Sequence, residues 1–319
     1  MKVVLLLVIA VATSVLGAGY FTDRLPLTAE NGARSSDVVL ANLLSGNTTP
    51  KTHVRSFIIG NSLVNHEAGR GSDLTSVPYW LARLARQDGN TYAMAGTYTL
   101  LREFKDKGPE STWSFNGVTS AWNSDGGVSF GDADFTSVQI NPLNYVQWRG
   151  PTEPYWDDNG TPVGATLEVI DVVTAAEPGI EVLIYEGWAD MGPFVSGDFP
   201  PSPRAFAKYH AYNLGEYHEW YLEYVRELQA ARPDVDIRLI PVSSALSTLL
   251  TQSPLNQLSP TDLYEDDAPH GTPTKYFLAS LVTYVGTYGK LPPTDFAVPP
   301  SVHPLVRSNY AEIVAALGG

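Results

Sequence analysis

The sequence contains no cysteine among its 319 residues. Disulfide bonds, thiolate metal sites and a cysteine nucleophile are therefore excluded, because each of them needs a cysteine sulfur. The absence also fits an exported protein that avoids oxidative mispairing of thiols. Hydrophobic residues nonetheless make up 44% of the chain, with 17 Tyr, 11 Phe and 7 Trp, so it can bury a sizeable core.

Basic residues are scarce relative to acidic ones. The chain has 20 Lys and Arg against 34 Asp and Glu, which gives a net charge of −14 and a pI of about 4.7. Nucleic acids bind to basic surfaces because of their phosphates, so we expect no nucleic-acid partner. Anionic membranes and strongly anionic polymers are disfavoured for the same reason. The ordinary interpretation is an acidic surface that keeps the protein in solution.

Long hydrophobic runs are absent except at the N-terminus. There Lys2 precedes an apolar run from Val3 to Leu16, and Gly17-Ala18-Gly19 supply small residues for cleavage. This pattern predicts a signal peptide over residues 1–19 and a secreted or periplasmic protein, with no stable membrane insertion after cleavage. The alternative is a retained N-terminal anchor, although the run is shorter than the ~20 residues that a membrane span needs.

The rest of the chain is predicted to be one domain with a lead-in. Residues 20–50 are polar and rich in turn-forming residues, and residues 51–319 contain neither an internal repeat nor a low-complexity linker. Strands and helices alternate along this part, which predicts an α/β fold, a three-layer α/β/α sandwich with a central, mostly parallel five-stranded sheet. Two insertions, near 106–134 and 147–161, are aromatic enough that we expect them to be ordered.

The expected strands are short runs rich in apolar residues, and they cover Val54 to Gly60, Tyr92 to Ala95, Phe135 to Ile140, Val182 to Tyr185 and Ile237 to Val242. The expected helices show helical periodicity or terminal signals such as proline at the start, and they cover Val77 to Arg86, Ala165 to Ala176, Pro203 to Ala231 and Pro273 to Tyr288. This alternation brings the carboxyl ends of several parallel strands to one edge of the sheet.

A serine follows the first of these strands directly, in the turn Gly60-Asn61-Ser62-Leu63. The carboxyl edge of an open α/β sheet is where such proteins bind ligands, so we expect Ser62 to lie at a site. A base is available in Asp267-Ala268-Pro269-His270, just before the last helix. An aspartate three residues before a histidine can accept the Nδ1–H and leave Nε2 free to take a proton from a serine. Asp266 is the alternative orienting carboxylate.

These motifs resemble those of the SGNH or GDSL-type serine hydrolases, over a stretch from about Ser56 to Gly289. The turn with Ser62 resembles the nucleophile block of that family, and Ala95-Gly96-Thr97 resembles the block whose glycine N–H serves the oxyanion hole. Asp267 and His270 resemble the last block. The resemblance implies a flavodoxin-like fold and an esterase with a Ser62, His270 and Asp267 triad, in which the backbone N–H groups of Ser62 and Gly96 face the oxyanion.

The third block departs from the family pattern. The family usually has Gly-x-Asn-Asp after the fourth strand, and its asparagine side chain donates into the oxyanion hole. Here the strand runs into Glu186-Gly187-Trp188-Ala189-Asp190, so that Ala189 stands where the donor would be. Loss of one oxyanion donor typically costs about 10²–10³ in rate. Asn141, which follows the third strand, is a possible replacement.

The leading interpretation is an exported serine esterase that removes small acyl groups, acetyl in the first place, from a carbohydrate without a cofactor or a metal. Asn61, Glu186 and Trp188 are the expected substrate contacts. Tryptophans can stack on sugar rings, but core packing is the preferred explanation for each one taken singly: Trp113, Trp122, Trp148, Trp156 and Trp188. The alternatives are a lipase or thioesterase of the same fold, or a catalytically impaired carbohydrate-binding protein.

Other titratable residues are candidates for a base, for metal ligands or for a glycosidase carboxylate pair. His66 is expected on the helix or loop after the serine rather than as a base. His210 and His218 have no partner at a metal-binding spacing, so a solvated or core position is expected for both. Glu186 and Asp190 together would suit a glycosidase, but a structural or substrate-contact position is the preferred interpretation.

Overall fold

The computed structural model describes residues 40, 43, 49–66, 72–142, 149–155, 159–195 and 197–319. The expected signal peptide and most of the lead-in lie outside the described residues, as does part of the insertion near 147–161. None of the helices in the described ranges is long and apolar enough to cross a membrane.

A six-stranded, all-parallel sheet forms the centre of the described chain, with the order β3-β2-β1-β4-β5-β6. The strands are β1 (His53–Gly60), β2 (Thr91–Tyr98), β3 (Thr119–Ser120), β4 (Ser137–Ile140), β5 (Glu181–Tyr185) and β6 (Ile237–Ile240). The predicted count of five strands is wrong. The two-residue β3 adds a sixth strand at the edge of the sheet, within the segment predicted to be an insertion. A strand that short has no periodicity to detect.

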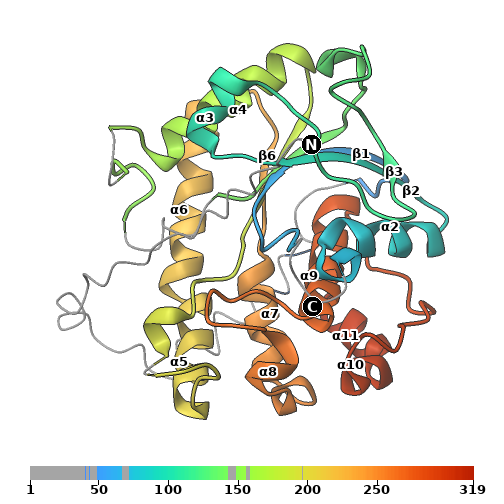
Figure 1. Cartoon of the computed structure of the whole chain (residues 1–319), viewed down its shortest axis with the longest axis vertical. Coiled ribbons are helices and arrows are strands. Elements are labelled where there is room, and N and C mark those ends of the chain that lie inside the picture. Colours follow the sequence, from blue (N-terminus) through green and yellow to red (C-terminus); the bar gives the residue numbers. More distant parts are fainter. Residues whose placement is uncertain are drawn as a thin grey trace, which may run out of the picture.

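Helices cover both faces of this sheet. On one face α2 (Val77–Gln87) packs against α9 (Pro273–Tyr288), and on the other α4 (Pro162–Ala176) packs against α6 (Glu216–Ala231) (Figure 1). Every residue of β4 and β5 is buried, as expected for strands covered on both sides. The arrangement fits a three-layer α/β/α sandwich.

The helix boundaries differ from expectation in one long segment. The helix expected from Pro203 to Ala231 is two helices, because the backbone leaves the helical conformation at Gly215, where φ is −105° and ψ is −110°. By contrast, α9 has the expected bounds and ends at Gly289 in the left-handed conformation. The other α-helices with bounds in the described residues are α3 (Leu101–Lys107), α5 (Pro203–Leu214), α7 (Val242–Thr251), α8 (Pro260–Leu263), α10 (Pro304–Ser308) and α11 (Tyr310–Ala316).

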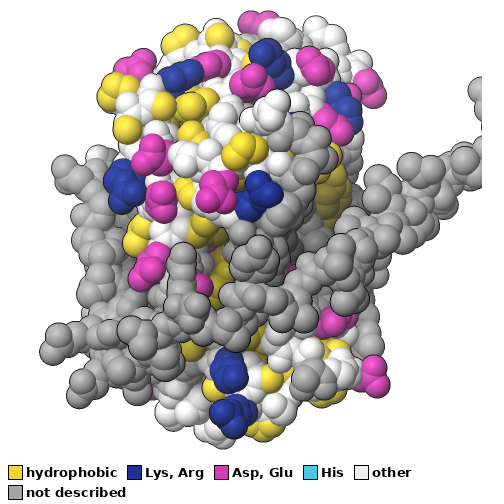
Figure 2. Space-filling view, turned by 90° about the vertical axis from the view of Figure 1, so that its left-hand side faces the viewer, with side chains coloured by type: hydrophobic (Ala, Val, Ile, Leu, Met, Phe, Trp, Pro, Cys, Tyr) yellow, Lys and Arg dark blue, Asp and Glu magenta, His cyan; other side chains and the backbone are white. Residues whose placement is uncertain are grey.

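Charges of both signs are mixed on the helical surface. Figure 2 shows the face on the left of Figure 1, where acidic and basic side chains are interspersed. Helices of this side form cross-links such as Arg232 to Asp171 at 2.7 Å and Lys105 to Glu168 at 3.0 Å. Such exposed pairs contribute little to stability, so the packing of the layers carries the fold.

Two glycines on neighbouring strands allow Trp113 to pack directly on the sheet. A Cβ atom at Gly60 would lie 2.8 Å from the Trp113 ring, and one at Gly96 would lie 2.6 Å from it. Because real side chains do not approach so closely, only glycine at these two positions admits the indole. The insertion that contains Trp113 is thereby fixed to β1 and β2, next to the turn that carries Ser62.

Gly96→Ala should therefore destabilise the protein by about 1–3 kcal/mol, the usual cost of overpacking. Chemical denaturation of the variant and the wild type measures this difference. In a Trp113→Leu background the same substitution should cost clearly less, because the nearest neighbour of the new Cβ is gone. Equal costs in the two backgrounds would contradict the packing described here.

Candidate active site

The candidate site lies where the winding of the sheet reverses. Without β3, the strand order β2-β1-β4-β5-β6 is that of a doubly wound sheet whose switch point falls between β1 and β4. Ser62 comes two residues after β1, and Asn141 follows β4 directly. Ligands bind at the carboxyl ends of the strands at such a point. The topology thus places Ser62 in the region where a ligand is expected.

Asn61 shapes the turn that carries Ser62. Its Oδ1 accepts the Leu63 N–H at 2.9 Å, and its carbonyl accepts the N–H groups of Val64 and Asn65 at 3.0 and 3.1 Å. An asparagine that bonds the backbone two residues on is a common turn-forming device. The side-chain oxygen of Asn61 is used within the turn, and the expectation that Asn61 contacts substrate stays a prediction.

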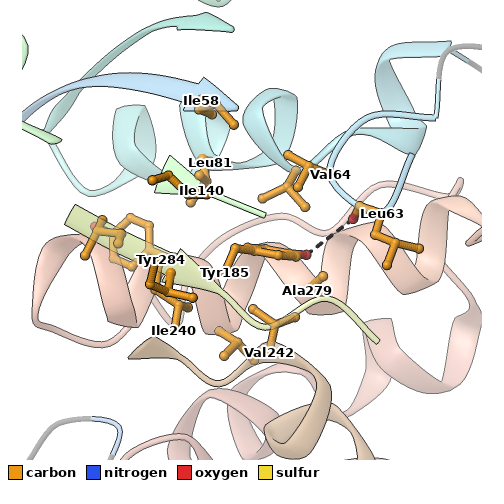
Figure 3. Packing of buried hydrophobic residues seen from close by; sticks show 14 of the residues in the cluster. Ile58, Leu63, Val64, Leu81, Ile140, Tyr185, Ile240, Val242, Ala279 and Tyr284 are labelled. Carbon is orange, nitrogen blue, oxygen red and sulfur yellow. Dashed lines mark hydrogen bonds between the residues drawn. The ribbon is translucent and has the colours of Figure 1, made fainter. Parts of the chain in front are cut away.

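Two buried tyrosines hold the carbonyl groups of this turn. The Tyr276 hydroxyl donates to the Ser62 carbonyl, and the Tyr185 hydroxyl donates to the Leu63 carbonyl at 3.3 Å (Figure 3). Burial raises the pKa of both hydroxyls well above its usual value, so both remain protonated donors. The turn is therefore fixed from α9 and from β5, two elements far away in the sequence.

Ser62 itself keeps two groups available. Its backbone N–H and its Oγ have no hydrogen-bond partner among the described residues, and the side chain is half-buried. No Ser62 Oγ–His270 hydrogen bond is present in this part of the chain. Hydrogen bonds of catalytic groups are often long before substrate binds and tighten in the complex.

His270 is oriented by Asp266, not by Asp267. Its Nδ1 lies 2.7 Å from Asp266 Oδ2, while Asp266 Oδ1 accepts the backbone N–H groups of His270 and Ala268 at 2.9 and 3.1 Å. Burial opposes ionisation of Asp266, but the bonds from His270 outweigh it and lower the pKa of this carboxyl. The same carboxylate thus closes the turn and holds the imidazole.

The prediction that Asp267 orients His270 is therefore wrong. Its side chain is exposed and extends towards Asp190, since the Cβ position of Gly192 lies near the carboxylates of both. Burial raises the pKa of Asp190, the Gly192 N–H lowers it, and the charge of Asp267 raises it further. Spacing alone suggested Asp267, but the backbone of the turn presents the carboxylate four residues before the histidine.

His66 stacks on His270, which the sequence did not indicate. The two imidazole rings are nearly parallel, with their centroids 4.0 Å apart and an interplanar angle of 7°. His66 is anchored by Thr75, whose carbonyl accepts its N–H and whose hydroxyl donates to its carbonyl, both at 2.9 Å. Together with the bond from Tyr276 to Ser62, this stack brings the serine turn and the His270 loop together at one edge of the sheet.

The two further oxyanion donors expected from the sequence are placed elsewhere. Gly96 pairs with Ile58 inside the sheet, two residues before the end of β2, and it is Tyr98 that pairs with Gly60. Gly96 serves the packing of Trp113 instead. The prediction that the Gly96 N–H serves the oxyanion hole is therefore wrong.

Asn141 lies next to the serine turn but beneath it. It is 3% exposed, and its Nδ2 donates to the Tyr185 carbonyl at 3.1 Å. A Cβ at Gly187 would lie 2.7 Å from this Nδ2 and 2.8 Å from Leu63 Cδ1, so only glycine leaves room for both side chains here. In this structure Asn141 supports the turn from below, which corrects its expected oxyanion role.

The residues of the third block are structural. Glu186 is fully buried and bonds His218 Nδ1 at 3.1 Å and the Ser244 hydroxyl at 2.9 Å. Burial disfavours a charged His218, but Glu186 outweighs burial and raises the pKa of this histidine. Trp188 is 1% exposed, and its indole N–H donates to the Pro269 carbonyl at 2.9 Å. Both expected substrate contacts, Glu186 and Trp188, are thus corrected, and Trp188 supports the His270 loop.

Two of the tryptophans and His210 lie in the core, the position preferred for the tryptophans and one of the two expected for His210. Trp113 and Trp122 belong to the core, while Trp148 and Trp156 lie outside the described residues. His210 is buried as well, 3.1 Å from the Ser247 hydroxyl, and burial lowers its pKa to about 3. Within the described ranges, no group of three or more His, Asp or Glu side chains is arranged to hold a metal ion.

Lys275 is a buried cation behind the His270 loop that sequence reasoning missed. It is 1% exposed, and its Nζ lies 4.7 Å from the centre of a Trp188 ring and 4.9 Å from that of Tyr264. No carboxylate pairs with it in the described part of the chain. Burial lowers its pKa to about 7, and the aromatic faces supply the favourable contacts that remain for a cation.

No protein-family model matches the chain, and no curated protein matches it either. The chain is similar to a solved DUF4886 family protein from Bacteroides uniformis, with 13% identity over 83% of this chain and 93% of that chain and a TM-score of 0.48. A second solved chain is 14% identical over 74% of this chain and 95% of its own length, with a TM-score of 0.35. Likenesses this weak support no argument about function.

Lys275→Met should stabilise the protein at pH 7 by about 1–4 kcal/mol, because it removes a buried charge without leaving a cavity. Between pH 7 and 10 the unfolded chain keeps the lysine proton that the folded state has lost, so wild-type stability should rise with pH and the variant should lack this rise. Denaturation midpoints across this range measure both effects. Lys208→Met, at an exposed position of α5, is the matched control, and a less stable Lys275→Met protein would contradict the account.

Proposed function

We propose that this protein is a serine hydrolase of ester bonds, with a flavodoxin-like fold of the SGNH type. Ser62 is the nucleophile, His270 the general base and Asp266 the orienting carboxylate. The observation that carries the proposal is the His270–Asp266 pair, 2.7 Å long, on a loop packed against the turn that presents Ser62. A base oriented by a carboxylate beside a serine with a free hydroxyl is the arrangement that activates serine.

The proposed reaction proceeds through an acyl-enzyme. Ser62 Oγ attacks the ester carbonyl while its proton passes to His270 Nε2, and Asp266 stabilises the imidazolium that forms. The free N–H of Ser62 donates to the developing oxyanion. His270 then protonates the departing alkoxide. Water attacks the acyl-enzyme with the same base, which releases the carboxylic acid and restores Ser62.

Matched asparagine variants test the assignment. Ser62→Ala should lower kcat/KM for p-nitrophenyl acetate to the background rate, and Asp266→Asn should lower it by about 10⁴ because an amide N–H facing Nδ1 favours the tautomer whose proton is on Nε2, which cannot accept the serine proton. Asp267→Asn changes the neighbouring carboxyl in the same way and should cost less than about tenfold. Wild-type rates in Ser62→Ala, or equal losses in the two asparagine variants, would rule out this site.

The proposed substrate is a small acyl ester, acetyl in the first place, on an uncharged carbohydrate. The acidic chain disfavours anionic polymers, and the exposed large hydrophobic side chains among the described residues are only Tyr98, Val128 and Leu222, which does not favour a lipid entrance. Tyr98 is 40% exposed, pairs with Gly60 at the carboxyl edge and packs edge-on against Trp113 at 5.0 Å. It is the aromatic ring suited to contact a sugar beside Ser62.

Tyr98→Ala should therefore raise KM for an acetylated sugar by about tenfold, while kcat/KM for p-nitrophenyl acetate changes by less than about threefold, since only the sugar uses the ring. Acetate release from a panel of acetylated mono- and oligosaccharides provides the measurement. Leu222→Ala is the control, because Leu222 is also exposed, at 50%, but lies on α6. Absence of acetate release from every sugar would remove the carbohydrate part of the proposal.

A further inference from the structure

His66 forms a second contact on His270 that the proposed reaction does not use. His270 is fixed along its edge by the Asp266 carboxylate at Nδ1, and across its face by the parallel His66 ring at 4.0 Å. A hydrogen bond to one nitrogen still allows the ring to tilt about the bonded edge. A flat contact over the face opposes that tilt, so the two contacts together define the direction of Nε2.

His66 is itself held from several sides. Its backbone is bonded in both directions to Thr75, and its ring is half-buried. Its Nε2 lies 3.8 Å from a Glu265 carboxylate oxygen. It follows Ser62 by four residues, directly after the turn and the bridge residue Asn65. One short segment therefore carries the nucleophile and covers the face of its base.

We propose that His66 is a positioning residue for the His270 base, which acts through the stacked ring and must remain uncharged for the reaction to proceed. The inference rests on the proposed serine-hydrolase function. In this proposal His66 holds the His270 ring in place. The reaction then also depends on the protonation state of His66.

The charge requirement follows from the stack. His270 becomes an imidazolium during the reaction, and two cationic rings 4.0 Å apart repel each other. Burial lowers the pKa of His66 first, and His270 lowers it further, while Glu265 and Asp266 raise it. These are the titratable groups of the described chain that act on this ring. A neutral His66 is thus the resting form near pH 7, and protonation at lower pH opposes a charged His270.

Two substitutions at position 66 distinguish the effect of the stacked ring from the effect of its protonation. His66→Phe keeps an aromatic ring over His270 but cannot take a proton, so kcat/KM for p-nitrophenyl acetate above pH 7.5 should stay within about threefold of wild type. His66→Ala removes the ring, and misplacement of the base should lower this plateau by tenfold or more. The acid limb of the wild-type pH profile should be steeper than one ionisation, and that of His66→Phe should follow a single ionisation.

A wild-type plateau in His66→Ala would overturn the positioning role. Equal losses in His66→Ala and His66→Phe with an unchanged acid limb would show a merely structural role, and would overturn the proposal as well.

A titration without turnover distinguishes this inference from the proposed function. The His66 Cε1–H resonance of the full chain is followed by NMR against pH in the wild type and in His270→Asn, with assignment from His66→Phe. The apparent pKa of His66 should lie below 6.5 in the wild type and higher in His270→Asn, where the neighbouring charge is absent. Identical curves would overturn the stacked coupling even if ester hydrolysis depends on Ser62. Coupled curves in a protein without Ser62-dependent hydrolysis would instead refute the proposed function alone.

Discussion

The candidate site depends on two tyrosine hydroxyls that reach the backbone of one turn. Tyr276 from α9 and Tyr185 from β5 donate to the successive carbonyls of Ser62 and Leu63. A buried carbonyl without a partner costs about 1–3 kcal/mol, so these bonds select the turn conformation in which the Ser62 N–H and Oγ remain free. The conformation around Ser62 is therefore set by residues that lie 122 and 214 positions away from their partners in the chain.

The packing around this turn uses glycine where larger residues would keep the elements apart. Gly187 leaves room for the side chains of both Asn141 and Leu63, and Gly60 lets the Trp113 indole lie on the sheet. On the other side Trp188 donates to the Pro269 carbonyl and supports the His270 loop. The third block thus has a structural explanation, because its Trp188 supports the His270 loop and is itself buried.

Local sequence signals were enough for the parts of the site that are local. The first strand with its serine turn, and the helix from Pro273 to Tyr288, follow from apolar patterning, turn residues and terminal signals. The choice between Asp266 and Asp267 depends on the backbone path of a short turn, which spacing does not determine. The stack of His66 on His270 is a contact between distant segments, and a single sequence contains no signal for it.

The central claim is that Ser62 is an activated nucleophile. Treatment of the intact protein with a fluorophosphonate, followed by mass spectrometry of the whole chain and of its peptides, tests this most directly, because the reagent reacts with a serine only where a base removes its proton. The account predicts one adduct per chain, located on Ser62, with labelling lost in His270→Asn. An adduct on another residue, or no adduct at pH 8, would contradict it.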